Sequence, residues 1–260
     1  MSKALITGAS SGIGRALSQL LSHEGYQLIL HGRNISELDS LAQELGKGTT
    51  WVSADLSVSE ERKKVMEAIH EEQPDLCVFN AGFGLYGPVL EHTLEQESSM
   101  VEVNVTSIVE LCISTLQLWK EKKIRGTILN VSSVAAFTNF PYFATYAASK
   151  AFVLHFSRSL NEEVKDRGIR VLASCPGVVK THFRERAAQG NPIQQKSWGE
   201  MDVEYSAQRM WKQIQKGKQV DIFDWRYRFL VFVTQYLIPY SWQGNISTRM
   251  IERLYESPKY

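Results

Sequence analysis

The sequence contains only three cysteines, Cys77, Cys112 and Cys175, and no two of them are closely spaced. Cysteine-based metal sites and redox pairs need short spacings, so we expect neither here. Cys77 and Cys175 lie in apolar, strand-like runs. We therefore expect reduced core cysteines, no metal site and a cytoplasmic location.

An excess of charge and long apolar runs are also missing. The 29 basic and 28 acidic side chains leave a net charge of +1, and we expect no nucleic-acid partner because phosphate binding favours a basic surface. No apolar run approaches the roughly 20 residues that a transmembrane helix needs. An apolar stretch starts at Ala4, directly after Met1-Ser2-Lys3, so we expect no signal peptide. The chain has no internal repeat and no linker.

What the chain does have is a regular alternation of short apolar runs and longer amphipathic stretches. The runs occupy residues 4–7, 26–31, 49–53, 76–80, 127–131, 170–175 and 220–223, and helical periodicity is clear at 36–45 and 59–71. This alternation is typical of a doubly wound α/β fold with helices on both faces of the sheet. We predict one Rossmann-type domain over residues 1–260, with about seven parallel strands.

Ligands bind such sheets at the carboxyl ends of the strands. The first predicted strand runs directly into a glycine-rich turn and then a helix. Glycines let the backbone approach a pyrophosphate, and the helix amino terminus offers free N–H groups. The predicted dinucleotide-binding residues of this turn are Gly8, Ser10, Ser11, Gly12, Ile13 and Gly14.

The second strand ends at His31-Gly32-Arg33-Asn34. An acid at this place accepts hydrogen bonds from the adenosine ribose, whereas a base binds a 2′-phosphate. This stretch has no acid, and Arg33 offers a guanidinium. We therefore predict NADP as the cofactor and NAD as the less favoured one. The alternative is that Arg33 is an ordinary surface charge.

The third and fourth strands end in two further candidate groups. Asp55 can accept from an adenine amino group with Leu56 alongside the ring, or it can be the N-cap of the next helix. The small residues of Asn80-Ala81-Gly82 let a ribose or nicotinamide lie against the backbone.

Tyr146 and Lys150 are four residues apart and therefore share one face of a helix. A neighbouring ammonium favours the phenolate, so we expect Lys150 to lower the pKa of Tyr146 and to make it a proton donor or acceptor near neutral pH. Ser133 follows the strand 127–131 and can donate to the same substrate oxygen. Tyr-x-x-x-Lys alone is a common surface pattern, and it gains meaning only from the other motifs.

Asn104 lies within a predicted long helix over 94–119. Asparagine is a mediocre residue in a helix interior. Two interpretations stay open: it holds a water beside Lys150, or it is a hydrogen-bonded core amide.

Taken together, these motifs resemble the short-chain dehydrogenase/reductase family, in its compact single-domain branch. The matching pieces appear in the family's order: Thr7-Gly8-x-x-x-Gly12-Ile13-Gly14, Asp55-Leu56, Asn80-Ala81-Gly82, Asn104, Ser133, Tyr146-x-x-x-Lys150 and Pro176-Gly177-x-x-x-Thr181.

The resemblance implies a catalytic tetrad of Asn104, Ser133, Tyr146 and Lys150, with Tyr146 and Lys150 also touching the cofactor. It also implies that Pro176, Gly177, Val179 and Thr181 lie at the nicotinamide. Ser132 competes with Ser133 for the serine role. The family's usual spacing favours Ser133, and only one of two successive strand residues should face the site. Phe79 stands where many members have another asparagine.

Beyond Thr181 no motif matches, and this part should determine the substrate. We predict a substrate lid over 182–203, in which Arg184 and Arg186 are candidates for binding a carboxylate. The expected substrate is a hydrophobic ketone or aldehyde, because the residues near the nicotinamide are largely apolar. These residues are Phe83, Leu85, Tyr86, Val134, Ala135, Phe137, Phe140, Phe143, Val178 and Phe183.

The carboxyl-terminal stretch, residues 225–260, combines a high density of aromatic residues with interleaved arginines. Three interpretations stay open: a helical cover over the substrate mouth, a subunit interface in a homodimer or homotetramer, and a surface that touches a membrane.

We predict an NADPH-dependent reductase or dehydrogenase that interconverts a carbonyl compound and its alcohol. The alternatives are an epimerase or dehydratase on the same fold, and a non-catalytic dinucleotide-binding partner protein.

Overall fold

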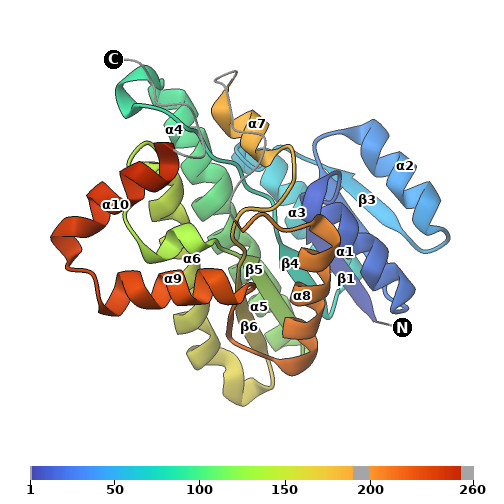
Figure 1. Ribbon diagram of the computed structural model, residues 1–260. Coiled ribbons are helices and arrows are strands. Elements are labelled where there is room, and N and C mark those ends of the chain that lie inside the picture. The colour runs from blue at the N-terminus through green and yellow to red at the C-terminus, as the bar shows by residue number, and fades with distance from the viewer. Residues whose placement is uncertain (1, 190–198, 253–260) are drawn as a thin grey trace.

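A single seven-stranded sheet forms the centre of the computed structural model, which describes residues 2–189 and 199–252 (Figure 1). All of its strand pairs are parallel, in the order β3-β2-β1-β4-β5-β6-β7. The predicted fold class is therefore confirmed. The strands are β1 (Lys3–Thr7), β2 (Gln27–Gly32), β3 (Thr50–Ser53), β4 (Leu76–Phe79), β5 (Thr127–Val131), β6 (Arg170–Cys175) and β7 (Val220–Ile222).

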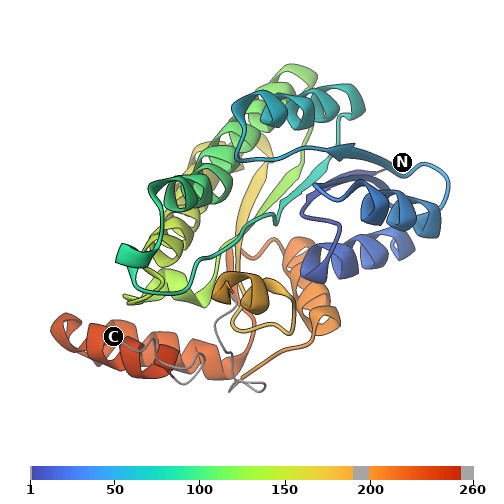
Figure 2. The ribbon, with the colours of Figure 1, turned by 90° about the horizontal axis from the view of Figure 1, so that it is seen from above.

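Helices cover both faces of the sheet (Figure 2). Ile6 and Leu30 pack into the core beneath α1, α2 and α8, whereas their neighbours Leu5 and Ile29 pack against α3, α5 and α6. The helices are α1 (Gly12–His23), α2 (Ile35–Leu45), α3 (Ser59–Glu72), α4 (Leu94–Val101), α5 (Ser107–Lys122), α6 (Ala144–Val164), α7 (Phe183–Ala188), α8 (Val203–Lys216), α9 (Trp225–Tyr236) and α10 (Tyr240–Glu252), with short turns η1 (Val89–Glu91), η3 (Val134–Phe137) and η4 (Lys165–Arg167).

The strand order reverses between β1 and β4, which pair with each other at the middle of the sheet. Side-chain hydrogen bonds connect the ends of β1 and β4. The Oγ1 of Thr7 accepts hydrogen bonds from the backbone N–H of Asn80 at 2.9 Å and of Ala81 at 3.0 Å, and the Asn80 amide donates to the Thr7 carbonyl at 3.0 Å. Such a reversal leaves a crevice at the carboxyl ends of the strands, where ligands bind.

The predicted helix over 94–119 is interrupted by a π-helical turn, η2 (Glu102–Thr106). Arg62 of α3 holds both sides of the turn, because its guanidinium lies 2.9 Å from Glu102 and 2.7 Å from Glu110. Single π turns are frequent at functional sites. This one carries Asn104, which is almost fully buried.

The stretch Leu94–Lys122 is long and apolar enough to cross a membrane by length and composition alone. It is not an uninterrupted apolar run, because polar residues such as Asn104 and Glu110 lie within it. Half of its most apolar window is buried inside the domain, where Leu111, Cys112 and Trp119 pack into the core. A core helix of a soluble domain has the same properties.

Candidate active site

The carboxyl ends of the strands surround a cavity of about 490 Å³. Nearly every residue predicted as catalytic or cofactor-binding lines it, and the two exceptions are Gly14 and Asn104, which lie behind its wall. The predicted residues in the lining are Gly8, Ser10, Ser11, Gly12, Ile13, Arg33, Asp55, Leu56, Asn80, Ala81, Gly82, Ser133, Tyr146, Lys150, Pro176, Gly177, Val179 and Thr181.

The glycine-rich turn after β1 brings the start of α1 close to the strand. A Cβ on Gly14 would lie 2.2 Å from the carbonyl oxygen of Gly8, so no larger residue fits there. The N-cap Ser11 makes no side-chain capping bond, and the first turn of α1 carries no acidic residue. The positive end of the helix dipole therefore faces the cavity without a competing carboxylate.

Arg33 reaches out from the end of β2 and lies next to Asp55 at the end of β3. Its Nη1 is 3.5 Å from Asp55 Oδ2, and 68% of the Arg33 side chain is exposed. An exposed pair of this kind contributes little to stability, so the guanidinium is free to contact a ligand. A Cβ on the adjacent Gly32 would lie 3.1 Å from Ser10 Oγ, which places Ser10 at the same corner of the cavity.

Asp55 shapes the turn after β3. Its Oδ1 accepts from the backbone N–H of Ser57 at 2.9 Å and from the Ser57 hydroxyl at 2.8 Å. Partial burial alone would raise the pKa of Asp55, but the Ser57 hydrogen bonds and the charge of Arg33 lower it overall. The N-cap of α3 is Val58, so the alternative that Asp55 caps this helix is wrong.

His31 lies beneath this corner and was not among the predicted site residues. It lines the cavity, and its Nε2 is 3.1 Å from the Ala54 carbonyl. Burial lowers its pKa to about 4. His31 is therefore neutral at physiological pH, which leaves Arg33 as the cation at this corner of the cavity.

Tyr146 and Ser133 meet within the cavity, and their side chains are hydrogen-bonded to each other. Ser133 also accepts from the backbone N–H of Ala135 at 3.1 Å. The hydroxyl of Ser132 instead donates to the Lys150 carbonyl at 2.7 Å. Of the two competing serines, the structure brings Ser133 to the tyrosine.

Lys150 lies one helical turn after Tyr146, with its Nζ 5.7 Å from the centre of the Tyr146 ring. The ammonium donates to the Val131 carbonyl at 3.0 Å and therefore points towards the end of β5.

The expected lowering of the tyrosine pKa by Lys150 is wrong for the protein alone. Burial raises the pKa of Tyr146 to about 12, against the opposing effect of the Ser133 hydrogen bond. Burial also lowers the pKa of Lys150 to about 8. Desolvation penalises the charged form of both groups, and it is the largest cause of both shifts.

The side chain of Asn104 makes three hydrogen bonds within the protein. Its oxygen accepts from the Phe83 N–H at 3.1 Å, and its nitrogen donates to the Phe83 carbonyl at 2.8 Å and to Ser149 Oγ at 3.1 Å. Of the two open interpretations, the side chain matches the hydrogen-bonded amide. It fixes the segment after β4 against α6.

Tyr227 is a site residue that sequence reasoning missed. It comes from α9, is almost fully buried, and its hydroxyl accepts from the Val178 N–H at 3.1 Å. A Cβ on Gly177 would lie 2.1 Å from the Tyr227 ring. The ring therefore supports the backbone after Pro176. No sequence signal distinguishes this tyrosine from the other aromatic residues of the tail.

Aromatic residues surround the tyrosine at the open side of the cavity. The Tyr146 ring centre is 5.6 Å from that of Phe143 and 5.5 Å from that of Phe183 in α7. Of the ten predicted apolar residues, all but Tyr86 and Phe137 line the cavity.

The predicted lid, 182–203, includes residues 190–198, which lie outside the described residues. Of its described part, α7 is joined to the body by a hydrogen bond of 2.8 Å from the Tyr86 N–H to the Ala187 carbonyl. Met201 bonds to the segment after β6 on both sides, to Val178 and to Lys180. Both Arg184 and Arg186 line the cavity, and Arg184 is 3.3 Å from Glu200.

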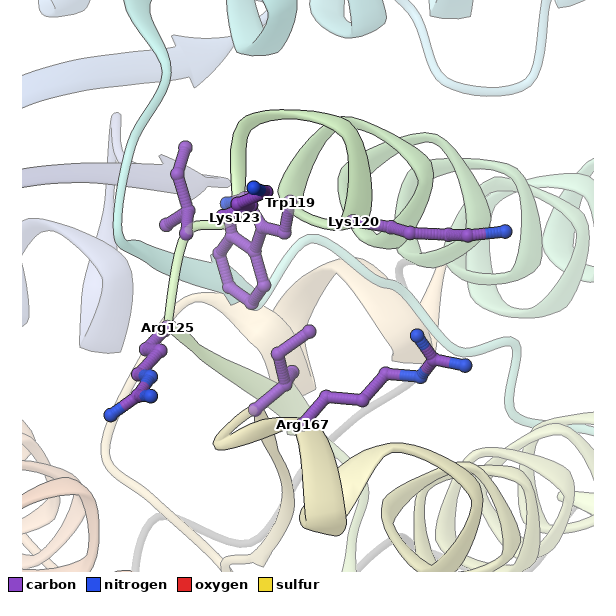
Figure 3. Close-up of a pocket in the computed structure, with 7 residues that line it drawn as sticks. Trp119, Lys120, Lys123, Arg125 and Arg167 are labelled. Carbon is purple, nitrogen blue, oxygen red and sulfur yellow. The ribbon is translucent and has the colours of Figure 1, made fainter.

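A second cavity, of about 240 Å³, lies around the end of α5 and the start of β6, on residues distinct from those of the first. Lys120, Lys123, Arg125 and Arg167 line it together with Trp119. Their charged ends do not converge, because Lys120 and Arg167 extend to one side and Arg125 to the other (Figure 3). Its lining combines cationic and apolar side chains without a carboxylate or histidine beside the lysines, and we assign no catalytic chemistry to it.

Comparison with known proteins supports one family. The family model for short chain dehydrogenases matches residues 2–192. An uncharacterized oxidoreductase of Staphylococcus epidermidis is 34% identical over 184 residues, which covers 70% of this chain and 80% of that protein. A serine 3-dehydrogenase of Rhizobium radiobacter is 34% identical over 192 residues, covering 72% of this chain and 76% of that protein.

Solved structures of similar proteins support the same family. A short-chain dehydrogenase from Sphingobium yanoikuyae in complex with NADPH has a TM-score of 0.82 and 28% identity, and the match covers 91% of this chain and 95% of that one. The bulky-bulky ketone specific alcohol dehydrogenase from Comamonas testosteroni has a TM-score of 0.77 and 27% identity, covering 91% and 93%.

The contact between Gly177 and Tyr227 can be tested by Gly177→Ala. The added methyl group overlaps a buried ring, so the free energy of unfolding should fall by about 1–3 kcal/mol. Gly244→Ala is the matched control, because nothing lies within 4 Å of its Cβ position in α10. Alanine should leave that helix equally or more stable. Denaturation in urea measures both, and an unchanged midpoint for Gly177→Ala would contradict the contact.

The lowered pKa of Lys150 predicts a pH dependence of stability. The pKa of Lys150 is about 8 in the folded chain, against an ordinary value of 10.5. At pH values between these two, Lys150 is neutral in the folded chain and protonated in the unfolded chain. The unfolded state then binds more protons, so this residue makes stability rise with pH in that window. Lys150→Met removes the effect. Urea denaturation of both proteins across this pH window measures the effect. The free energy of unfolding of the wild type should rise relative to that of the variant as the pH increases. Parallel plots of this free energy against pH would contradict the pKa shift.

Proposed function

This chain belongs to the short chain dehydrogenase family, and from that premise we propose that it interconverts a carbonyl compound and its alcohol by hydride transfer with a nicotinamide dinucleotide, preferably NADPH. The supporting observation is that Ser133, Tyr146 and Lys150 line the same cavity as the glycine-rich turn after β1.

The residues present fit a dinucleotide along the whole length of the cavity. The tight packing of Gly14 on Gly8 leaves the start of α1 open to a pyrophosphate. Arg33 stands at one end for an adenosine 2′-phosphate, with Ser10 beside it. At the other end, Tyr227 supports the backbone after Pro176, which would bind the carboxamide of the nicotinamide. Thr181 lies close to the glycine-rich turn, because a Cβ on Gly12 would lie 3.1 Å from the Thr181 methyl group.

When bound, the nicotinamide supplies or accepts the hydride. Tyr146 gives the proton to the carbonyl oxygen in reduction, or takes it from the alcohol in oxidation. The hydroxyl of Ser133, hydrogen-bonded to Tyr146, polarises the same oxygen. Lys150 would bind the ribose hydroxyls through its ammonium.

The raised pKa of Tyr146 has a direct consequence for this chemistry. With a pKa of about 12, the phenol is protonated at neutral pH and is ready to act as an acid. A positive charge brought close to the ring would stabilise the phenolate, and Lys150 is the nearest protein group that can carry one. Asn104 acts indirectly, by fixing the segment at Phe83.

A hydrophobic ketone or aldehyde is the substrate class that we propose. The open side of the cavity is walled by Phe143, Phe183 and Phe140, with Val134 and Leu85 nearby. Apolar walls with few polar groups bind apolar substrates. The solved alcohol dehydrogenase specific for bulky ketones is a relative with a compatible activity.

Tyr146→Phe tests the proton donor. The ring and its contacts with Phe143 and Phe183 stay, so folding and NADPH binding should be preserved, whereas kcat should fall by roughly 10²–10⁴-fold. Tyr26→Phe is the control, because this tyrosine packs on Trp211, away from the cavity. The measurement is kcat with a panel of apolar ketones. A Tyr146→Phe variant that keeps more than about a tenth of wild-type kcat would exclude Tyr146 as the acid.

Arg33→Gln tests cofactor choice. A charge-assisted contact contributes about 1.5–3 kcal/mol, so kcat/KM with NADPH should fall roughly ten- to a hundredfold while kcat/KM with NADH stays constant. Arg15→Gln is the control, because Arg15 pairs with Glu37 and Glu44, each at 2.9 Å.

A stronger change, Gly32→Asp with Arg33→Ile, should invert the preference, because the new carboxylate repels the phosphate. The Cβ of residue 32 would lie 3.1 Å from Ser10 Oγ and 3.3 Å from Ser10 Cβ. Rotation of the hydroxyl relieves the first contact, and a small shift of the Ser10 side chain is needed for the second. A wild type that prefers NADH, or a double variant that still prefers NADPH, would show that the phosphate is bound elsewhere.

A further inference from the structure

The outward side of α9 carries a stripe of exposed aromatic rings. Trp225, Phe229, Phe232 and Tyr236 follow the i, i+4, i+7, i+11 spacing of one helix face, and they are 72%, 64%, 51% and 76% exposed. Tyr227, on the opposite side, is buried. The usual amphipathic order is thus reversed, because the aromatic face points away from the domain.

The exposed surface continues beyond α9. Leu237, at the end of the helix, is 65% exposed, and Trp242 in α10 is 64% exposed. We call these six side chains, Trp225, Phe229, Phe232, Tyr236, Leu237 and Trp242, the outer aromatic face. Both views place α9 and α10 on the side of the molecule opposite α2 and β3 (Figures 1 and 2). Single exposed apolar residues are ordinary, whereas a contiguous group marks an interaction surface.

The charges around this face are positive on balance. Residues 224–252 include three arginines, Arg226, Arg228 and Arg249, and two acids, Asp224 and Glu252. Arg226 pairs with Asp224 at 2.9 Å. Arg228 donates to the carbonyls of Ile222 and Phe223, and within the described residues no carboxylate pairs with it. The segment that carries the aromatic rings therefore has a net charge of +1, from three arginines and two acids.

The combination of aromatic rings and arginines distinguishes between two possible partners of this face, a second copy of the chain and a bilayer surface. A second copy of the chain in a twofold contact would bring the same patch, arginines included, against itself. A bilayer surface offers what both components need: Trp and Tyr favour the boundary between headgroups and acyl chains, and arginines favour anionic headgroups. A helix of 12 residues is about 18 Å long, too short to span the bilayer.

We propose that the outer aromatic face docks the protein on the surface of a membrane that carries anionic lipids, with α9 lying in the plane of the interface. The inner side of the same helix stays in the domain. Tyr227 contacts the backbone after Pro176, and Gln235 hydrogen-bonds to Phe137 at the end of η3, the turn that follows Ser133. The docked side therefore adjoins the walls of the cavity.

Vesicle co-sedimentation of the full chain tests the docking without any assay of activity. The vesicles are phosphatidylcholine alone or phosphatidylcholine with phosphatidylglycerol. The wild type should bind the anionic vesicles more strongly, and added salt should weaken the binding. In Phe229→Ser with Phe232→Ser, which removes two rings from the outer aromatic face, the partition coefficient should fall by at least roughly tenfold, because binding scales with the inserted apolar area.

The matched control is Ile35→Ser with Trp51→Ser. It removes two exposed apolar side chains, 56% and 38% exposed, from α2 and β3 on the opposite side, and it should bind vesicles like the wild type. NADPH binding, measured by fluorescence, confirms that each variant is folded, because neither Phe229 nor Phe232 lines the cavity.

Three results would overturn the proposal: a wild type that binds neither kind of vesicle, an outer-face variant that binds as well as the wild type, or a control that loses binding equally. If size-exclusion chromatography with light scattering showed a dimer that only the outer-face variant dissociates, and vesicles bound nothing, the face would be an interface between two copies.

Discussion

The hydrogen bonds between Thr7 and Asn80 hold together the two strand ends at which the order of the sheet reverses. Every other part of the site is placed relative to this junction. The glycine-rich turn leaves β1 on one side of it, and the segment after β4 leaves on the other. Because all strands are parallel, the ends of β2, β3, β5 and β6 reach the same edge, and one cavity collects residues from six loops.

Burial is what gives the site its chemistry, and it acts on both partners of the Tyr146–Lys150 pair. It holds the phenol protonated and brings the ammonium close to losing its proton near neutral pH. In the protein alone, desolvation therefore makes both the phenolate of Tyr146 and the ammonium of Lys150 unfavourable. A ligand that adds charge or excludes further water changes both pKa values together, since the groups share one desolvated environment. Protonation of the pair is thus coupled to what the cavity contains.

The sequence determines the strands well, because each is an apolar run between a polar turn and a glycine or polar residue. All seven lie within one residue of the predicted bounds. Residues near strand ends, such as Arg33 and Ser133, line the cavity, because parallel strands bring their ends to one edge of the sheet.

What the sequence did not reveal depends on tertiary contacts. The π turn at Asn104 is held by Arg62, which is 42 residues earlier in the chain, and Tyr227 reaches Gly177 across 50 residues. The pKa of Tyr146 could not be foreseen from its spacing to Lys150, because spacing says nothing about burial. The direction in which the α9 rings point is likewise set by the domain beneath the helix.

The two sides of α9 show why one segment supported several interpretations at once. Its inner side is a cover: the Tyr227 hydroxyl satisfies the backbone N–H of Val178, a polar task that an aliphatic residue could not perform. Its amino terminus is fixed by Asp224, whose carboxylate accepts from the Arg226 N–H at 2.8 Å. These contacts act on the inner side of the helix, whereas the outer rings stay between 51% and 76% exposed. The proposed docking on a membrane surface would remove these rings from water. Cover and docking surface are therefore compatible roles of one helix, one for each of its faces.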